Sequence, residues 1–257
     1  MKTKLLTLAL AALTIGLLGS CEKNNGPETS KLPKGALSGE FTVNAEGKKV
    51  HFSKGNLTYN VSTATWAFYE HQYDCATGYD SNLISLFTWG YGTWSTSPKS
   101  NSYQTGDFTD WGSQIGDGNT WRTLSKYELT YLFYTRTVNG GQKEGHSFQR
   151  ATINSDATGV YGMILYPDNY TETAKTLYTS AEWATAEGKG CVFLPAAGKH
   201  FVGSEVFHVG NHGYYWSSSA YLDNDAELVF FKSSSVNPVT TDSRWGGCSV
   251  RLVTDVN

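Results

Sequence analysis

Short runs of alternating apolar and polar residues constrain this chain more than any other feature of its sequence. The alternation starts at Phe41 and Val43 and resumes, after a turn, at Val50 and Phe52. It continues in a further set of apolar residues: Leu57, Tyr59, Val61, Trp66 and Phe68. A spacing of two places side chains on one face of a β-strand. With 27 Gly and 16 Tyr but only 2 Met, the sequence predicts many short strands and an N-terminal β-meander, not a helical bundle.

The first twenty residues have the pattern of an export signal. Lys2 and Lys4 precede an apolar run over residues 5–18, which is too short to span a membrane stably. The run ends in Leu-Gly-Ser before Cys21, which resembles the lipobox of bacterial lipoproteins. The resemblance implies that Cys21 is diacylated and becomes the mature N-terminus, anchored at the outer membrane. Periplasmic and cell-surface orientations are both open, and an ordinary signal peptide with a chance cysteine is the alternative.

The composition around the signal peptide restricts the class of partner. Removal of residues 1–20 takes away Lys2 and Lys4 and no acidic residue, so the net charge changes from −3 to about −5. A mildly acidic chain without a basic run is a poor nucleic-acid binder. Residues 21–35 are polar and contain Gly and Pro, which predicts a flexible tether. Residues 36–257 show no internal repeat or linker, and we expect one domain there.

Two helix starts are clear. Ser125–Glu128 has the spacing of a capping box, and the apolar residues that follow predict a helix to about Arg136. Thr179–Glu182 is a second capping box, and Gly188 ends its helix. Strand patterns surround them at Ala151–Ile153, Val160–Leu165, Cys191–Ala197, Gly213–Ser219, Ala226–Lys232 and Ser249–Val253. The expected fold class is α+β, with mostly antiparallel short strands, two main helices and long loops.

Four segments occur in an order found in known proteins. They are Trp121–Glu128 (WRTLSKYE), Val192–Gly198 (VFLPAAG), Tyr215–Ser219 (YWSSS) and Gly247–Val253 (GCSVRLV). In this order they resemble C-type-lectin-like proteins, in the branch of formylglycine-generating enzymes and the variable proteins of diversity-generating retroelements. Gut-bacterial lipoproteins with Fibrobacter-type major paralogous domains are similar too. The resemblance runs from about residue 36 to the end and implies a C-type-lectin-like fold.

The same resemblance implies a ligand-binding surface near the C-terminus. Ser233–Pro238, Arg244 and Ser249–Val253 resemble the fixed framework of a retroelement-diversified segment. In such proteins the positions between framework residues vary and contact the ligand. The positions implied here are Tyr221, Asp223, Asn224, Leu228, Phe230, Lys232, Thr240, Asp242 and Trp245.

The strand pattern suggests which of these side chains are exposed. A period of two places Leu228, Phe230 and Lys232 on one face of Ala226–Lys232. Because Lys232 should contact water, we expect the other two on the exposed face as well. Glu227 has the opposite parity and conflicts with this register. The alternative is that both faces are buried and Phe230 belongs to the core.

Catalytic chemistry has few candidates. A catalytic relative of the formylglycine-generating enzymes would need a reactive thiol, and Cys191 and Cys248 lie in apolar strand patterns typical of inert buried cysteines. A disulfide between them and two free thiols are both open, with Cys75 as the third cysteine.

Metal and sugar motifs are equally sparse. His200, His208 and His212 lack the spacing of a metal site, and we expect loop histidines. The calcium-dependent sugar motif of animal C-type lectins is absent. Arg251 is expected to make structural hydrogen bonds.

The sequence therefore predicts a non-enzymatic lipoprotein without a cofactor or metal. Its partners would be the membrane, through the lipid anchor, and a protein or glycan on another cell, a phage or a host, but no nucleic acid. A catalytic relative of the formylglycine-generating enzymes and an adhesin of fixed specificity are the alternatives.

Overall fold

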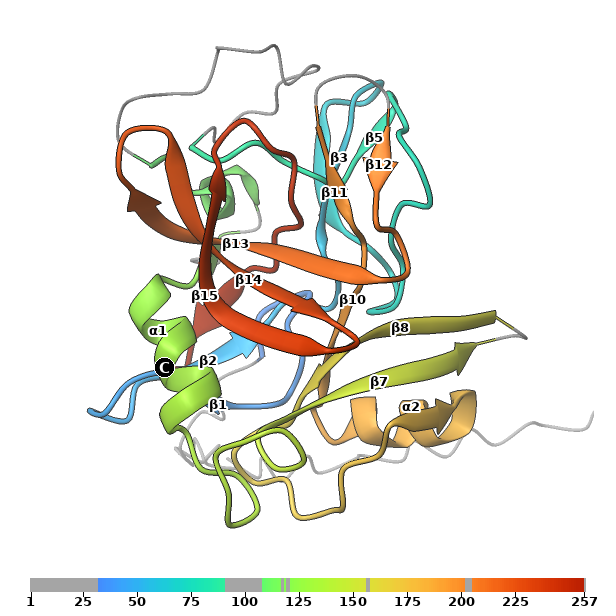
Figure 1. Cartoon of the computed structure of the whole chain (residues 1–257), viewed down its shortest axis with the longest axis vertical. Helices are drawn as coiled ribbons and strands as arrows, with labels where there is room; N and C mark the ends of the chain where they lie inside the picture. Colours follow the sequence, from blue (N-terminus) through green and yellow to red (C-terminus); the bar gives the residue numbers. More distant parts are fainter. Residues whose placement is uncertain are drawn as a thin grey trace, which may run out of the picture. The chain divides into compact units, whose positions relative to one another are not determined.

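The structure is a computed structural model that describes residues 32–90, 108–116, 118, 121–155, 158–201 and 205–256. It is a mixed α+β fold of mostly antiparallel short strands in several sheets, with two α-helices (Figure 1). The expected fold class is confirmed at this level. The expected signal peptide, Cys21 and most of the tether lie outside the described residues. In the described part, no helix has the length and apolar character needed to cross a membrane.

The N-terminal strands form where the alternation predicts them. They are β1 (Phe41–Thr42), β2 (Lys49–Phe52), β3 (Leu57–Asn60) and β4 (Thr65–Phe68). They do not pair as one continuous meander, however, because they belong to two sheets, β1-β2-β16-β6 and β4-β3-β5. The other members are β5 (Leu83–Ile84), β6 (Trp121–Arg122) and β16 (Val253–Asp255). The residues between β2 and β3 form hydrogen bonds to the C-terminal segment instead, with Ser53 N donating to Leu252 O at 2.9 Å.

A third sheet has the strand order β10-β8-β7-β9. Its strands are β7 (Phe148–Ser155), β8 (Thr158–Leu165), β9 (Leu177–Thr179) and β10 (Val192–Pro195). Helix α2 (Ser180–Gly188) contributes Trp183 to the buried cluster on this sheet, where its ring lies 5.6 Å from that of Phe193. The strand patterns at 151–153, 160–165 and 191–197 are thus confirmed as strands.

Both predicted capping boxes are present. Helix α1 (Lys126–Thr130) is capped by Ser125 with Glu128, and it continues as a π-helical turn, η2 (Tyr131–Thr135), up to Arg136. Thr179 and Glu182 cap α2 in the same way. A 3-10 turn, η1 (Trp111–Gln114), precedes β6. The helices start where predicted because a capping box depends only on residues three positions apart.

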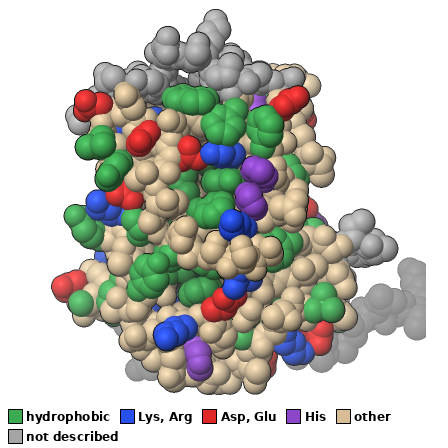
Figure 2. Space-filling model, in the orientation of Figure 1, with side chains coloured by type: hydrophobic (Ala, Val, Ile, Leu, Met, Phe, Trp, Pro, Cys, Tyr) green, Lys and Arg blue, Asp and Glu red, His purple; other side chains and the backbone are tan. Residues whose placement is uncertain are grey.

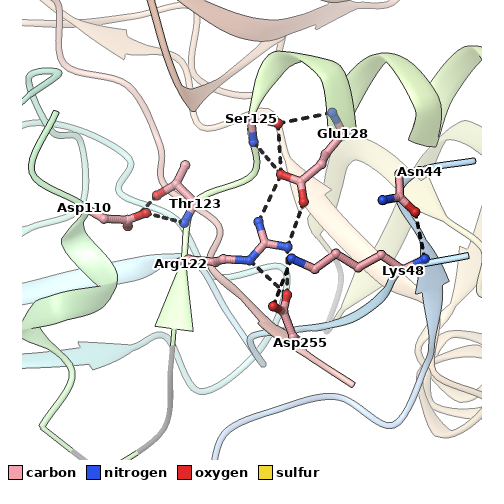
Figure 3. Close-up of polar contacts among 8 residues, drawn as sticks. All are labelled: Asn44, Lys48, Asp110, Arg122, Thr123, Ser125, Glu128 and Asp255. Atoms are coloured by element: carbon pink, nitrogen blue, oxygen red, sulfur yellow. Dashed lines mark hydrogen bonds and ion pairs between the residues drawn. The ribbon is translucent and has the colours of Figure 1, made fainter. Parts of the chain in front are cut away.

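Arg122 joins the first helix to the C-terminal strand (Figure 3). Its guanidinium donates to both carboxylate oxygens of Glu128, at 3.0 and 2.8 Å, and from Nε to Asp255 at 2.9 Å. Lys48 pairs with the same aspartate at 3.0 Å. Burial raises the pKa of Glu128, but the hydrogen bonds from Arg122 and Ser125 outweigh it and lower that pKa. The network therefore favours ionised carboxylates.

The sheet that carries most of the predicted site residues contains β13 (His212–Tyr221), β14 (Asp225–Lys232) and β15 (Ser235–Ser243), in that order. A short hairpin, β11 (Lys199–His200) with β12 (Val206–Phe207), precedes it in the chain. Val229 and Phe231 enter one core cluster, whereas Leu228 enters another and is only 1% exposed. Both faces of β14 are therefore covered over much of its length.

The expected exposed face is consequently wrong for Leu228. The period of two assigns the side chains of β14 to its two faces correctly. The face that carries Leu228 is nevertheless covered by residues distant in sequence, and Leu57, Phe87, Trp89 and Trp111 belong to its cluster. Glu227, the residue that conflicted with the predicted register, is buried on the other face. It pairs there with Lys126 of α1 at 3.2 Å.

The C-terminal segment is buried but mostly irregular. Ladder pairing begins only at Val253, so the predicted strand at 249–253 is displaced to Val253–Asp255. Arg251 is 5% exposed and donates to Gln72 at 2.7 Å, to the carbonyl of Phe193 at 3.3 Å and to Asn56 at 3.4 Å. The expected structural role of Arg251 is confirmed.

Candidate ligand-binding face

One face of the β13–β15 sheet carries five of the nine predicted site residues. Cross-strand partners share a face, and Leu228 is opposite Thr240 while Ala226 is opposite Asp242. Phe230 and Lys232 follow Leu228 at intervals of two and lie on the same face. The period of two placed Leu228, Phe230 and Lys232 on one face, and the pairing with β15 adds Thr240 and Asp242 to it, although Leu228 lies beneath the surface.

An aromatic group lies at the open end of this face. The rings of Tyr214 and Phe230 are cross-strand partners with centroids 5.0 Å apart. His212 meets Phe230 edge-on at 5.5 Å and stacks on His208 at 4.2 Å. Phe230 and His212 are half-buried and His208 is exposed. Ligand atoms therefore have access to the edges of several rings at once.

Lys199 joins this group to a second set of aromatic side chains. Its Nζ lies 2.6 Å from Asp242, 4.2 Å from the centre of the Phe201 ring and 4.9 Å from that of Tyr214. The Phe201 ring is 5.2 Å from that of Trp245. The structure thus brings Trp245 and Asp242 to the surface that carries Phe230.

We call this surface the aromatic–basic face and define it by nine residues: Lys199, Phe201, His208, His212, Tyr214, Phe230, Lys232, Asp242 and Trp245. Figure 2 shows adjacent histidine side chains flanked by hydrophobic and basic ones on this side of the protein. Lys199, Phe201 and Tyr214 were missed by the sequence interpretation. The only sequence signal for Lys199 and Phe201 was that they flank His200, one of three closely spaced histidines.

The electrostatic environment at His212 is positive. Burial lowers the pKa of His212, and His208, Lys232 and Lys199 lower it further. Burial also raises the pKa of Tyr214 to about 12, so its hydroxyl remains protonated. That hydroxyl is 3.2 Å from His212 Nδ1. His212 is therefore a neutral hydrogen-bonding group at neutral pH and gains charge only in acid.

Tyr221, Asp223 and Asn224 lie elsewhere, at the turn that joins β13 to β14. This tip is at the opposite end of the hairpin from His212 and Lys232, which face one another across the strands. All three are exposed. Arg244 supports the tip because its guanidinium donates to backbone carbonyls there, at 2.8 and 2.9 Å. The nine predicted residues therefore form no single site.

The three cysteines of the described residues are free thiols and form no disulfide. Cys191 and Cys248 are buried, and Cys75 is half-buried. Burial raises the pKa of Cys191 to about 12 and that of Cys75 to about 11, and it raises the pKa of Cys248 as well. Because the thiolate is the nucleophile, these thiols are poorly suited to catalysis at neutral pH.

A hollow lies on the other side of β11. It encloses about 520 Å³ of space that includes open solvent, and its wall includes His200, whose ring stacks on Tyr79 at 5.2 Å. The remaining lining is largely apolar, with Leu83, Ile84 and Phe87 among its residues. His200 is thus separated from the other two histidines of the sequence triplet. No group of three or more His, Cys, Asp or Glu side chains suited to a metal exists among the described residues.

Comparisons with family models, with curated proteins and with solved structures find no significant match to this chain.

Proposed function

We propose that this chain is a membrane-anchored, non-enzymatic binding protein with a C-type-lectin-like fold. The observation that carries the proposal is the aromatic–basic face. Exposed and half-buried rings gather there with Lys199 and Lys232 at one end of the β13–β15 sheet. Aromatic side chains with a few polar groups are typical of ligand sites. The ligand would be a protein or a glycan outside the cell.

Binding can be tested with the full-length protein in detergent micelles. We expect it to bind glycans on an array, or intact bacterial or host cells, through the aromatic–basic face. Phe230→Leu, which removes an aromatic ring and keeps an apolar side chain, should reduce that binding. The matched control is Tyr134→Leu, since Tyr134 on η2 is 59% exposed and lies outside the face. Equal binding by the two variants would contradict the proposal.

The catalytic alternative is less well supported, because the thiols it would use are buried and protonated. The anchor and the diversification are separate parts of the proposal, and each has its own test. Cys21→Ser should abolish palmitate labelling and release the protein from membranes. A neighbouring reverse-transcriptase gene, with a near-copy of the 3′ end that differs only at adenines, would support diversification. An adhesin of fixed specificity would lack it.

A further inference from the structure

The open end of the aromatic–basic face carries an uncompensated positive charge. Lys199 is neutralised by Asp242, and this pair is only 14% and 18% exposed. Lys232 has no ion pair among the described residues, and it faces His212 across the β13–β14 ladder. Every charged neighbour that shifts the pKa of His212 is basic. A chain of net negative charge therefore presents a local site for an anion.

The neighbouring rings suit a flat group with polarised C–H bonds. The face of an aromatic ring carries partial negative charge, and the C–H bonds on one side of a sugar ring carry partial positive charge. The half-buried rings of Phe230 and His212, which meet edge-on with centroids 5.5 Å apart, could contact such a ring. An acidic peptide would satisfy the charge and leave these rings without a matching flat partner.

The distance between Phe230 and Lys232 fits one sugar unit with its acid group. Phe230 and Lys232 lie on the same face of β14, two residues and therefore about 7 Å apart along the strand. Arg150 fixes the end of this strand by donating to the carbonyl of Lys232 at 3.1 Å. Phe230 and Lys232 are thus held at a distance that a single monosaccharide can bridge.

We propose that this face binds a glycan bearing carboxylates, of the uronic- or sialic-acid class. The sugar ring would rest against the half-buried Phe230 and His212 rings, and its carboxylate would accept hydrogen bonds from Lys232. This inference rests on the proposed function and narrows its ligand to one chemical class.

The test compares an acid with its ester. Oligogalacturonate and oligosialic acid, each with its methyl ester, are titrated calorimetrically into the full-length protein at low salt. The acids should bind about tenfold more tightly than the esters, since a hydrogen bond to a charged group contributes roughly 1.5–3 kcal/mol. Lys232→Ala should weaken acid binding much more than ester binding and so remove that difference. Lys143→Ala, an exposed lysine in the loop before β7, is the matched control.

The outcomes separate this inference from the proposed function. Esters that bind as well as acids, no binding of either acid, or polyglutamate that binds as tightly as the glycans would each overturn the acidic-glycan assignment. Phe230→Leu should weaken acid and ester alike, with circular dichroism confirming its fold. If Phe230→Leu weakens the binding of other ligands but acids and esters bind equally well, the aromatic–basic face is still the binding site but has no preference for anions. If it changes no binding at all, the proposed function fails.

Discussion

Replacing Glu128 by alanine tests whether the Arg122 network stabilises the fold. The variant loses the bonds that the Glu128 carboxylate accepts from Ser125 and from Arg122, but its backbone N–H still donates to the Ser125 hydroxyl. The hydrogen bond from the Ser125 backbone to Glu128 contributes about 1 kcal/mol. A half-buried, two-pronged guanidinium–carboxylate contact contributes roughly 1.5–3 kcal/mol. Because Arg122 keeps Asp255 as a partner, we expect the lower part of that range and a total loss of about 3 kcal/mol.

The second capping box in the chain provides the control. Glu182→Ala removes the corresponding bonds that its carboxylate accepts from Thr179 on α2, but the partner lost there is Lys175, and both side chains are exposed. Exposed pairs contribute little, so Glu182→Ala should destabilise the protein clearly less than Glu128→Ala. Urea unfolding followed by tryptophan fluorescence gives both free energies. Equal losses would refute a stabilising role for the Arg122 contact.

Acid should remove the same contribution. The folded-state pKa of Glu128 is lowered from an ordinary value of 4.5. A lowered pKa means that folding favours the ionised form, so this stability is present above about pH 4.5 and is lost as the pH falls through the folded-state pKa. Between pH 5 and pH 3, the free energy of unfolding should therefore fall less in Glu128→Ala than in the unchanged protein. If the free energy of unfolding falls equally with pH in the two proteins, the pKa of Glu128 is not lowered by folding.

Three further predictions concern buried groups. Cys191 and Cys248 should react with a thiol reagent at pH 8 about a hundredfold more slowly in the native protein than in urea, because they are buried and protonated, whereas the half-buried Cys75 should be slowed less. Leu228→Ala should lower the free energy of unfolding by about 3 kcal/mol, the cost of a cavity in the core. The same urea assay should show about 3 kcal/mol lost in Arg251→Ala, which leaves a cavity and unpaired acceptors. Arg251→Met should lose less stability because the methionine side chain fills part of that cavity.

Local signals predicted the elements of this fold well. Both helices start at their capping boxes, and the strand patterns at 41–68, 151–165 and 226–232 correspond to strands. Strand β15 was obscured by Pro238, which cannot donate to a ladder. That residue lies where the pairing of β14 with β15 shifts register, between Leu228 and Phe230, so the missing donor is tolerated. A strand of this kind has no clear signature without its partner.

Burial was harder to predict because it depends on distant segments. The alternation in β14 fixes which side chains share a face, but it does not say what covers either face. The Leu228 side is covered by Trp89, Trp111 and Trp121 among others, and Glu227 is buried where Lys126 of α1 reaches it. The aromatic–basic face likewise needs Lys199 from β11 beside Tyr214 from β13. No pattern within either strand indicates that contact.

These contacts also limit what diversification could change at the nine implied positions. Leu228 fills a core cluster, so a polar or much smaller residue there would destabilise the sheet that presents the others. Asp242 neutralises Lys199 in a largely enclosed position, and its loss would leave a cation between two rings without a counter-charge. Phe230, Lys232, Thr240 and Trp245 have more freedom because each is only half-buried. Variation that alters a ligand while preserving the fold would therefore concentrate at those four positions and at the exposed hairpin tip.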